Sequence, residues 1–242
     1  VERFDGAMQE LDRNIQRAST VAMGALTGIG VASLKAGIDF ESSFAGIRKT
    51  VNGTEEDFEM LAAGMRNMSK EIPVNVNELN RIGEAAGQLG IKTENILDFT
   101  ETMAQLGVAT NLSSEEAATA LARLANITGM SQTDFDNLGS SIVALGNNFA
   151  TTEAEIVEMG LRLAGAGATI GMSESQILGF ATALTSVGIN AEAGGTAFSK
   201  LMIGISAEVE NGGDKLEDFA RIAGMAADDF VQKWQSDQAE AL

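Results

Sequence analysis

Acidic side chains have the greatest potential for chemistry in this chain. They gather in two runs, Glu55-Glu56-Asp57-Glu59 and Glu94, Asp98 and Glu101, the second at helical spacing. A pair of carboxylates could act as general acid and base on a glycoside, but the acid would need a desolvated pocket. Runs of this kind are much more often solvated helix faces, or first-turn residues that the helix dipole favours. We therefore expect neither run to be catalytic.

The 242-residue chain contains no His and no Cys. Without imidazole, these residues cannot form His-dependent triads, His-ligated metal hydrolases or imidazole pH switches. Without thiols, they cannot form disulfides or thiolate metal sites. Only carboxylate or lysine chemistry is left, so we predict no catalytic residue, no metal ligand and no cofactor, and we interpret the chain as non-enzymatic.

The charge balance argues against nucleic acid as a partner. Binding to a phosphate backbone requires Lys and Arg side chains that release condensed counterions. Here 16 Lys and Arg residues are scattered among 34 Asp and Glu residues, giving a formal net charge of -18, and they form no basic stripe. We predict no sequence-specific nucleic-acid binding, and we expect no sequence-independent binding either.

Signals for helix starts recur through the middle of the chain. Short polar side chains stand between loops and helix-favouring runs at Asn75, Ser113, Ser131, Thr151, Ser173 and Asn190. Such a side chain accepts a hydrogen bond from an unpaired backbone N–H near the start of the helix. An acid or amide three residues later can accept one in return from the backbone N–H of the cap. Taken alternately, residues 75, 113, 151 and 190 are 38, 38 and 39 apart, and residues 131 and 173 are 42 apart. These steps match two helices with their turns, so we predict helix pairs.

Composition and periodicity define the fold class. One Pro in the whole chain leaves helices uninterrupted, and no stretch alternates long enough to indicate a sheet. We predict an all-α fold in three parts: a long Gly/Ala-rich N-terminal helix over 1–50, an elongated array of antiparallel helix pairs over 51–207, and truncated C-terminal helices over 208–242. Ile127 and Leu201 each follow other apolar residues at helical spacing, so we expect their side chains to face the core.

Several glycines lie inside predicted helices rather than between them. Gly83, Gly87 and Gly160 each cost about 1 kcal/mol relative to Ala unless close packing offsets the loss. We interpret these three positions as points where helices cross at short distance. The sequence Gly165-Ala166-Gly167 could instead break a helix in two.

Residues 18–34 carry no charge and are bounded by Arg17 and Lys35. A membrane span needs about 20 predominantly apolar residues, so this segment is short and polar for one. Gly24 and Gly28 would let another backbone approach closely. Three interpretations are open: a packed or self-associating helix, which we favour, a segment that inserts into a membrane conditionally, and a constitutive span.

An ordered set of motifs gives the chain a family resemblance. Residues 40–51, 84–91 and 188–198 follow one another as in the shared region of phage tail tape measure proteins, and 219–225 and 230–234 are similar to that family's continuation. The chain from about residue 40 to its end therefore resembles this family. The order of several motifs is more specific than any one of them.

The resemblance implies a long, mostly helical protein that occupies the tail tube lumen, sets tail length during assembly and leaves with the DNA at infection. It implies contact with the tail tube protein and tail assembly chaperones, a stage in the host cytoplasm, and contact with the host inner membrane during ejection. Self-association is expected from the small residues of the N-terminal segment. No catalytic residue carries over. The chain starts without Met and ends where the family continues, so we interpret it as a fragment, with any cell-wall hydrolase module outside it.

A second hypothesis is a helical adaptor or secreted-effector domain that binds a protein partner through its array. Helical periodicity alone favours neither hypothesis, and the ordered motifs favour the tail protein. The length of the full parent chain would separate them, since several hundred further helical residues favour a ruler.

Overall fold

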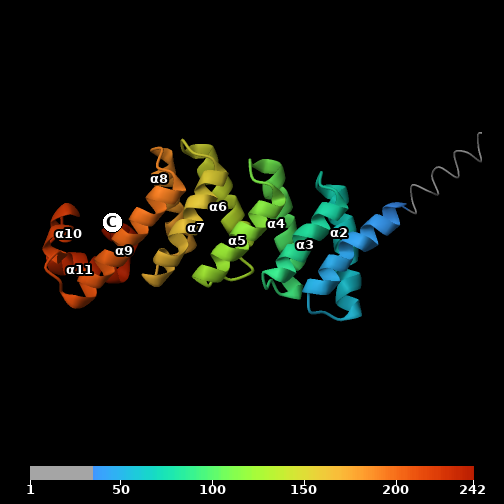
Figure 1. The fold of residues 1–242 in the computed structure, drawn as a ribbon, viewed down its shortest axis with the longest axis horizontal. Helices are drawn as coiled ribbons and strands as arrows, with labels where there is room; N and C mark the ends of the chain where they lie inside the picture. The colour runs from blue at the N-terminus through green and yellow to red at the C-terminus, as the bar shows by residue number, and fades with distance from the viewer. Residues whose placement is uncertain (1–34) are drawn as a thin grey trace, which may run out of the picture.

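A computed structural model describes residues 35–242, which form one elongated stack of helices (Figure 1). The predicted all-α fold is confirmed, because the described residues contain helices and turns but no β-strand. A helix over residues 35–50 comes first. It is followed by α2 (Glu55–Glu71), α3 (Val76–Gln88), the 3-10 turn η1 (Thr93–Asn95), α4 (Ile96–Ala109), α5 (Ser114–Thr128), α6 (Phe135–Asn148), α7 (Glu153–Thr169), α8 (Glu174–Ser186), α9 (Ala191–Asn211), α10 (Leu216–Ile222), α11 (Ala227–Ser236) and α12 (Gln238–Ala241).

The helices lie across the long axis of the stack in two layers (Figure 1). The helices α3, α5, α7 and α9 pack side by side and form the odd layer, and α2, α4, α6 and α8 form the even layer. The helix over residues 35–50 lies beside α3, where Gly83 approaches Ile47. Consecutive helices run antiparallel (Figure 1). The pairs α2–α3, α3–α4, α4–α5, α6–α7 and α7–α8 pack against each other across the two layers, which confirms the predicted array of helix pairs.

The helix starts repeat with a nearly constant step. In the odd layer the N-caps are residues 75, 113, 152 and 190, which are 38, 39 and 38 residues apart. In the even layer the N-caps are residues 54, 95, 134 and 173, which are 41, 39 and 39 apart. Each helix pair therefore adds a similar increment to the stack, as in a quasi-one-dimensional repeat protein.

One continuous apolar core runs between the two layers. Because α2 to α9 are only 13 to 21 residues long, packing rather than intrinsic propensity must hold them in place. The expectation that Ile127 and Leu201 face this core is wrong: they are 45% and 42% exposed. Each follows the apolar spacing but lies on the outward side of its helix, which no third layer covers.

Short helices close the C-terminal end of the stack. Here α10, α11 and α12 pack on one another, and α10 and α11 also contact α9. The buried rings of Phe230 and Trp234 stack with centroids 6.1 Å apart. Gln176 Nε2 in α8 donates to Asp237 Oδ1, the N-cap of α12, at 2.9 Å. This contact ties the terminal helices to the even layer.

The predicted domain limits stay predictions, although α9 runs through the limit drawn at residue 207. Most of the predicted N-terminal helix, including residues 18–34 with Gly24 and Gly28, lies outside the described residues. Among residues 35–242, no helix is both long and apolar enough to cross a membrane.

Candidate interaction surface

Capping side chains fix where the helices start and so decide which residues reach the surface. Asn75, Ser113, Ser173 and Asn190 are the N-caps of α3, α5, α8 and α9. Ser113 shows the reciprocal form: its Oγ accepts from the Glu116 N–H at 3.2 Å, and the Glu116 carboxylate accepts from the Ser113 N–H at 3.0 Å. Such bonds satisfy N–H groups that a helix leaves unpaired.

Thr151 is not a cap, and this prediction is wrong by one residue. The N-cap of α7 is Thr152, whose Oγ1 accepts from the Glu155 N–H at 3.3 Å, while Glu155 accepts from the Thr152 N–H at 2.9 Å. A capping box needs its acid three residues after the cap, and this spacing selects Thr152. The Thr151 hydroxyl lies 2.8 Å from Thr185 Oγ1 at the end of α8.

Ser131 is also not a cap. It lies three residues before Asp134, the N-cap of α6, and its Oγ accepts from the Thr133 N–H at 3.3 Å. Its carbonyl accepts from the Asp134 N–H at 3.1 Å, so Ser131 opens a turn that leads into the helix. The helix starts at Phe135 because this ring is buried in the core.

Three capping boxes carry an acid: Thr54 with Asp57, Ser113 with Glu116, and Thr152 with Glu155. The hydrogen bonds from each cap hold the pKa of the acid below its ordinary value, because they stabilise the carboxylate. The backbone N–H contributes most at Asp57 and Glu155, and the Ser113 hydroxyl contributes most at Glu116.

The three described glycines of the prediction differ in how closely they are packed. A Cβ at Gly83 would lie 2.9 Å from Ile47 Cδ1, and one at Gly87 would lie 3.0 Å from the carbonyl carbon of Thr50. The second contact is with backbone, which cannot rotate away. A Cβ at Gly160 would lie 3.2 Å from a leucine methyl of α8, a milder contact. Of the three glycines, the two on α3 that face the helix over residues 35–50 are therefore packed more closely than Gly160.

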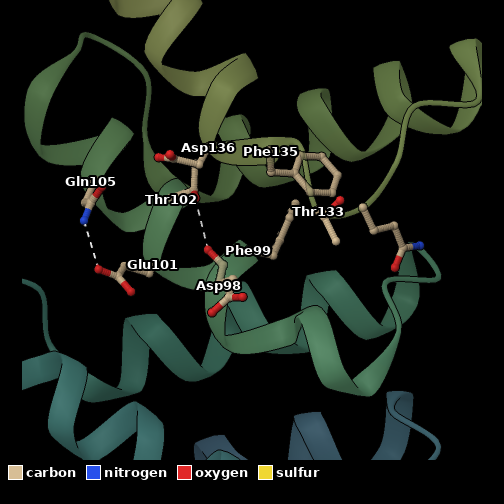
Figure 2. A pocket seen from close by; sticks show the side chains of 9 residues that line it. Asp98, Phe99, Glu101, Thr102, Gln105, Thr133, Phe135 and Asp136 are labelled. Atoms are coloured by element: carbon tan, nitrogen blue, oxygen red, sulfur yellow. Dashed lines mark hydrogen bonds between the residues drawn. The ribbon is translucent and has the colours of Figure 1, made fainter.

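The even layer carries a hollow on its surface where α4 and α6 lie side by side (Figure 2). Its first part, of about 300 Å³, is lined by three exposed carboxylates, Asp98, Glu101 and Asp136, and by two buried rings, Phe99 and Phe135. A second part of about 350 Å³ continues along the same two helices and is largely apolar. We call both parts together the α4–α6 hollow.

Contacts within the hollow hold its walls in place (Figure 2). The rings of Phe99 and Phe135 meet edge to face with centroids 4.7 Å apart. Gln105 Nε2 donates to Glu101 Oε1 at 3.1 Å, which partly satisfies this carboxylate. The carboxylates of Asp98 and Asp136 accept no hydrogen bond from any described residue.

This arrangement suits recognition of a cationic side chain with an apolar stem, because the carboxylates line one part of the hollow and the adjoining part is largely apolar. Within residues 35–242, no group of three or more acidic residues lies close enough to hold a metal ion. The sequence grouped Asp98 and Glu101 with Glu94, which does not line the hollow. It missed Asp136, which lies 38 residues after Asp98, and the repeat length is the signal that links them.

A two-layer stack of helix pairs is an α-helical repeat architecture, in which each pair contacts mainly its neighbours. Comparison with known proteins is consistent with this class. The family model described as phage-related minor tail protein matches residues 62–242. The chain therefore belongs to the phage-related minor tail protein family, which confirms the resemblance of its motifs and gives it a structural role in the phage tail.

One curated relative is the probable tape measure protein of Halomonas phage phiHAP-1, which is 25% identical over 204 residues. The match covers 79% of this chain and 23% of that protein, so the chain spans about a quarter of the relative's length. No solved structure matches the chain.

Proposed function

We propose that this region helps to set the length of a phage tail from inside the tail tube and has no catalytic role. The observation that carries the proposal is the constant step of 38 or 39 residues between odd-layer N-caps. A protein that measures length needs equal increments, and a repeat in which every pair adds the same number of residues supplies them.

The increment per pair depends on the conformation inside the tube. A pair laid out as one continuous helix spans roughly 58 Å, at about 1.5 Å per residue. The same pair folded as a hairpin along the tube axis spans about half as much. Stacked across the axis, as in Figure 1, it adds roughly 10 Å, the distance between packed helices. The change in tail length on removal of one pair therefore tests whether the region sets length. Its size also shows which of these conformations the pair adopts inside the tube.

The test is deletion of residues 113–151 from the parent phage. This removes α5 and α6 with their loops and joins Leu112 to Thr152. The cap Thr152 then follows Leu112 directly, as the cap Ser113 does in the wild type. We expect assembled particles whose tails are shorter by one of these increments. A matched control deletes residues 152–189, which joins Thr151 to the cap Asn190 and should shorten tails equally. Normal tails in both mutants would contradict the proposal.

We propose further that the protein leaves the tail with the DNA at infection. Short helices held by packing on their neighbours can separate pair by pair from one end, which suits passage through a narrow tube. Mass spectrometry of infected cells after removal of adsorbed particles should find peptides from residues 35–242 in the host fraction. Their complete retention in emptied particles would contradict this step.

The proposed partners follow from this location. They are the tail tube protein around the lumen, tail assembly chaperones in the host cytoplasm before assembly, and other copies of the chain. Insertion of residues 18–34 into the host inner membrane during ejection stays a prediction. Flotation of this chain with liposomes, compared with a variant that lacks those residues, would test it.

A further inference from the structure

The α4–α6 hollow changes character along its length. Its acidic part lies near the N-terminal ends of the two helices, where Asp98, Glu101 and Asp136 are exposed. Its largely apolar part continues toward their C-terminal ends, as far as Ala109 and Ala144. The two parts share lining residues, so they form one continuous groove. Between residues 98 and 109 this groove follows α4 for roughly 16 Å, at about 1.5 Å per residue.

No basic residue of the even-layer helices neutralises the acidic part. The helices α4, α6 and α8 contain no Lys or Arg. Lys92 is the last basic residue before α4, and it lines neither part of the groove. Among the residues that the structure describes, Asp98, Glu101 and Asp136 form no ion pair. The groove is therefore negatively charged at one end, and a partner of positive charge would complement it.

The apolar part is open to a close approach from outside. Buried residues lie at its base, where α4 and α6 touch: a Cβ at Gly139 would lie 3.1 Å from Thr102 Cγ2 and 3.4 Å from Leu106 Cδ1. Its edges carry small exposed residues, among them Ser140 and Ala144. Side chains of this size allow a third helix to pack on α4 and α6 at the usual distance of about 8–10 Å between axes.

An occupant that fits both parts needs cations at one end and apolar side chains along the rest. An amphipathic helix lying in a groove meets this need. Cations are favoured in the last turns of a helix, where the macrodipole is negative. The C-terminal end of the occupant would therefore lie over Asp98 and Asp136, at the positive ends of α4 and α6. This orientation makes the occupant antiparallel to both helices.

We propose that the α4–α6 hollow docks an amphipathic helix of a different protein, with Lys or Arg in its C-terminal turns and apolar residues before them. The formal net charge of -18 attracts a cationic partner and opposes a second copy of the chain. A free small amine would pair with the acids but leave the apolar part unfilled. The inference rests on the groove and not on the tail-length proposal, so tails of unchanged length would not affect it.

Two labelled synthetic peptides of about 18 residues serve as probes, a length that covers the groove. They have the same composition of Lys, Leu and Ala, with the three Lys in the last turns of one and in the first turns of the other. Fluorescence anisotropy measures their binding to this chain at about 0.15 M salt, where long-range attraction is screened. We expect the peptide with C-terminal Lys to bind about tenfold more tightly, because only this order fits both parts at once.

A hollow variant, Asp98→Asn, Glu101→Gln and Asp136→Asn, should bind that peptide about tenfold more weakly than wild type. The matched control is Glu192→Gln, Glu210→Gln and Glu217→Gln. It changes the net charge equally, and its residues are exposed and line neither part of the groove. Like Asp98 and Asp136, two of them lie in the first turns of helices. The control should lower the affinity less than about twofold.

Ala144→Trp tests the apolar part without changing the charge. Because Ala144 is exposed, the variant should keep its helical melting transition, and the indole should fill the groove and remove the preference between the two peptides. This variant decides the matter if the hollow variant fails to fold. Equal binding of both peptides to wild type, equal losses in the hollow and control variants, or a preference that survives Ala144→Trp would overturn the proposal. Self-association of the wild type that the hollow variant abolishes would assign the groove to a second copy and would also overturn it.

Discussion

The two layers of the stack share one repeat but differ in how tightly their helices meet. In the odd layer, a Cβ at Gly87 would lie 3.0 Å from the Thr50 backbone, and one at Gly195 would lie 2.6 Å from Arg162 Cβ. In the even layer, α4 and α6 leave the α4–α6 hollow on their surface, and their N-caps Asn95 and Asp134 make no side-chain capping bond. The even layer also has a close approach, because a Cβ at Gly64 in α2 would lie 2.6 Å from Leu97 in α4. The layers therefore differ in that odd-layer neighbours meet more extensively, while the even layer leaves a hollow on its surface.

The largest expected effect follows from the close approach in the odd layer. Gly87→Leu should destabilise the fold by roughly 1–3 kcal/mol, because the side chain would overpack against the Thr50 backbone. Gly179→Leu in α8 is the matched even-layer change, since a Cβ there meets no atom within 4 Å. It should change stability much less. Urea unfolding followed by circular dichroism measures both, and equal effects would contradict the difference between the layers.

Loss of a cap should distinguish α5 in the odd layer from α4 in the even layer. Ser113→Ala removes the hydroxyl of a complete capping box and should cost about 1 kcal/mol. Asn95→Ala, at the start of α4, removes no capping bond and should cost less than half of that. The same unfolding assay compares the two variants. A larger loss for Asn95→Ala than for Ser113→Ala would contradict this difference between the two helix starts.

A change of opposite sign is expected where a helical glycine has no close neighbour. Gly165 lies inside α7, which is one continuous helix, so the predicted break at 165–167 is wrong. A Cβ at Gly165 meets no atom within 4 Å, and Gly165→Ala should stabilise the fold by roughly 0.5–1 kcal/mol. A loss of stability would contradict the open surroundings of this glycine.

Acid should weaken the capping boxes by a small amount. The pKa values of Asp57, Glu116 and Glu155 are lowered in the folded chain, so these groups contribute stability above their unfolded pKa values. That contribution is lost as pH falls through the lowered pKa values. Glu116→Gln should therefore be less stable than wild type at pH 7, and the gap should narrow toward pH 3. A gap that is constant over this range would contradict the assignment.

The sequence predicted the repeat because its signals are local. A cap such as Asn75 or Ser113 needs only its own loop and the first turn that follows, so spacing alone predicted the pairs. Thr151 and Thr152 are neighbouring hydroxyls, and only the position of Glu155 distinguishes them. Ser131 was misjudged because burial of Phe135, a tertiary contact, sets the start of α6.

The surface was harder to predict than the fold. The α4–α6 hollow joins Asp98 to Asp136 across 38 residues, and helical spacing within one segment cannot show such a pairing. Ile127 satisfies an apolar period but lies on the outward side of α5, because periodicity does not say how many layers cover a helix. Comparing Asp98 with the residues about one repeat further along the chain would have drawn attention to Asp136.

The central claim is that one helix pair is an interchangeable unit of length, and duplication of residues 113–151 in the parent phage tests it most directly. The duplicated chain should fold, because each junction again joins Leu112 or Thr151 to a cap at the start of an odd-layer helix. Electron microscopy of the mutant particles should show tails longer than wild type by the amount that deletion of the same residues removes. Assembled particles with unchanged tails would contradict the account.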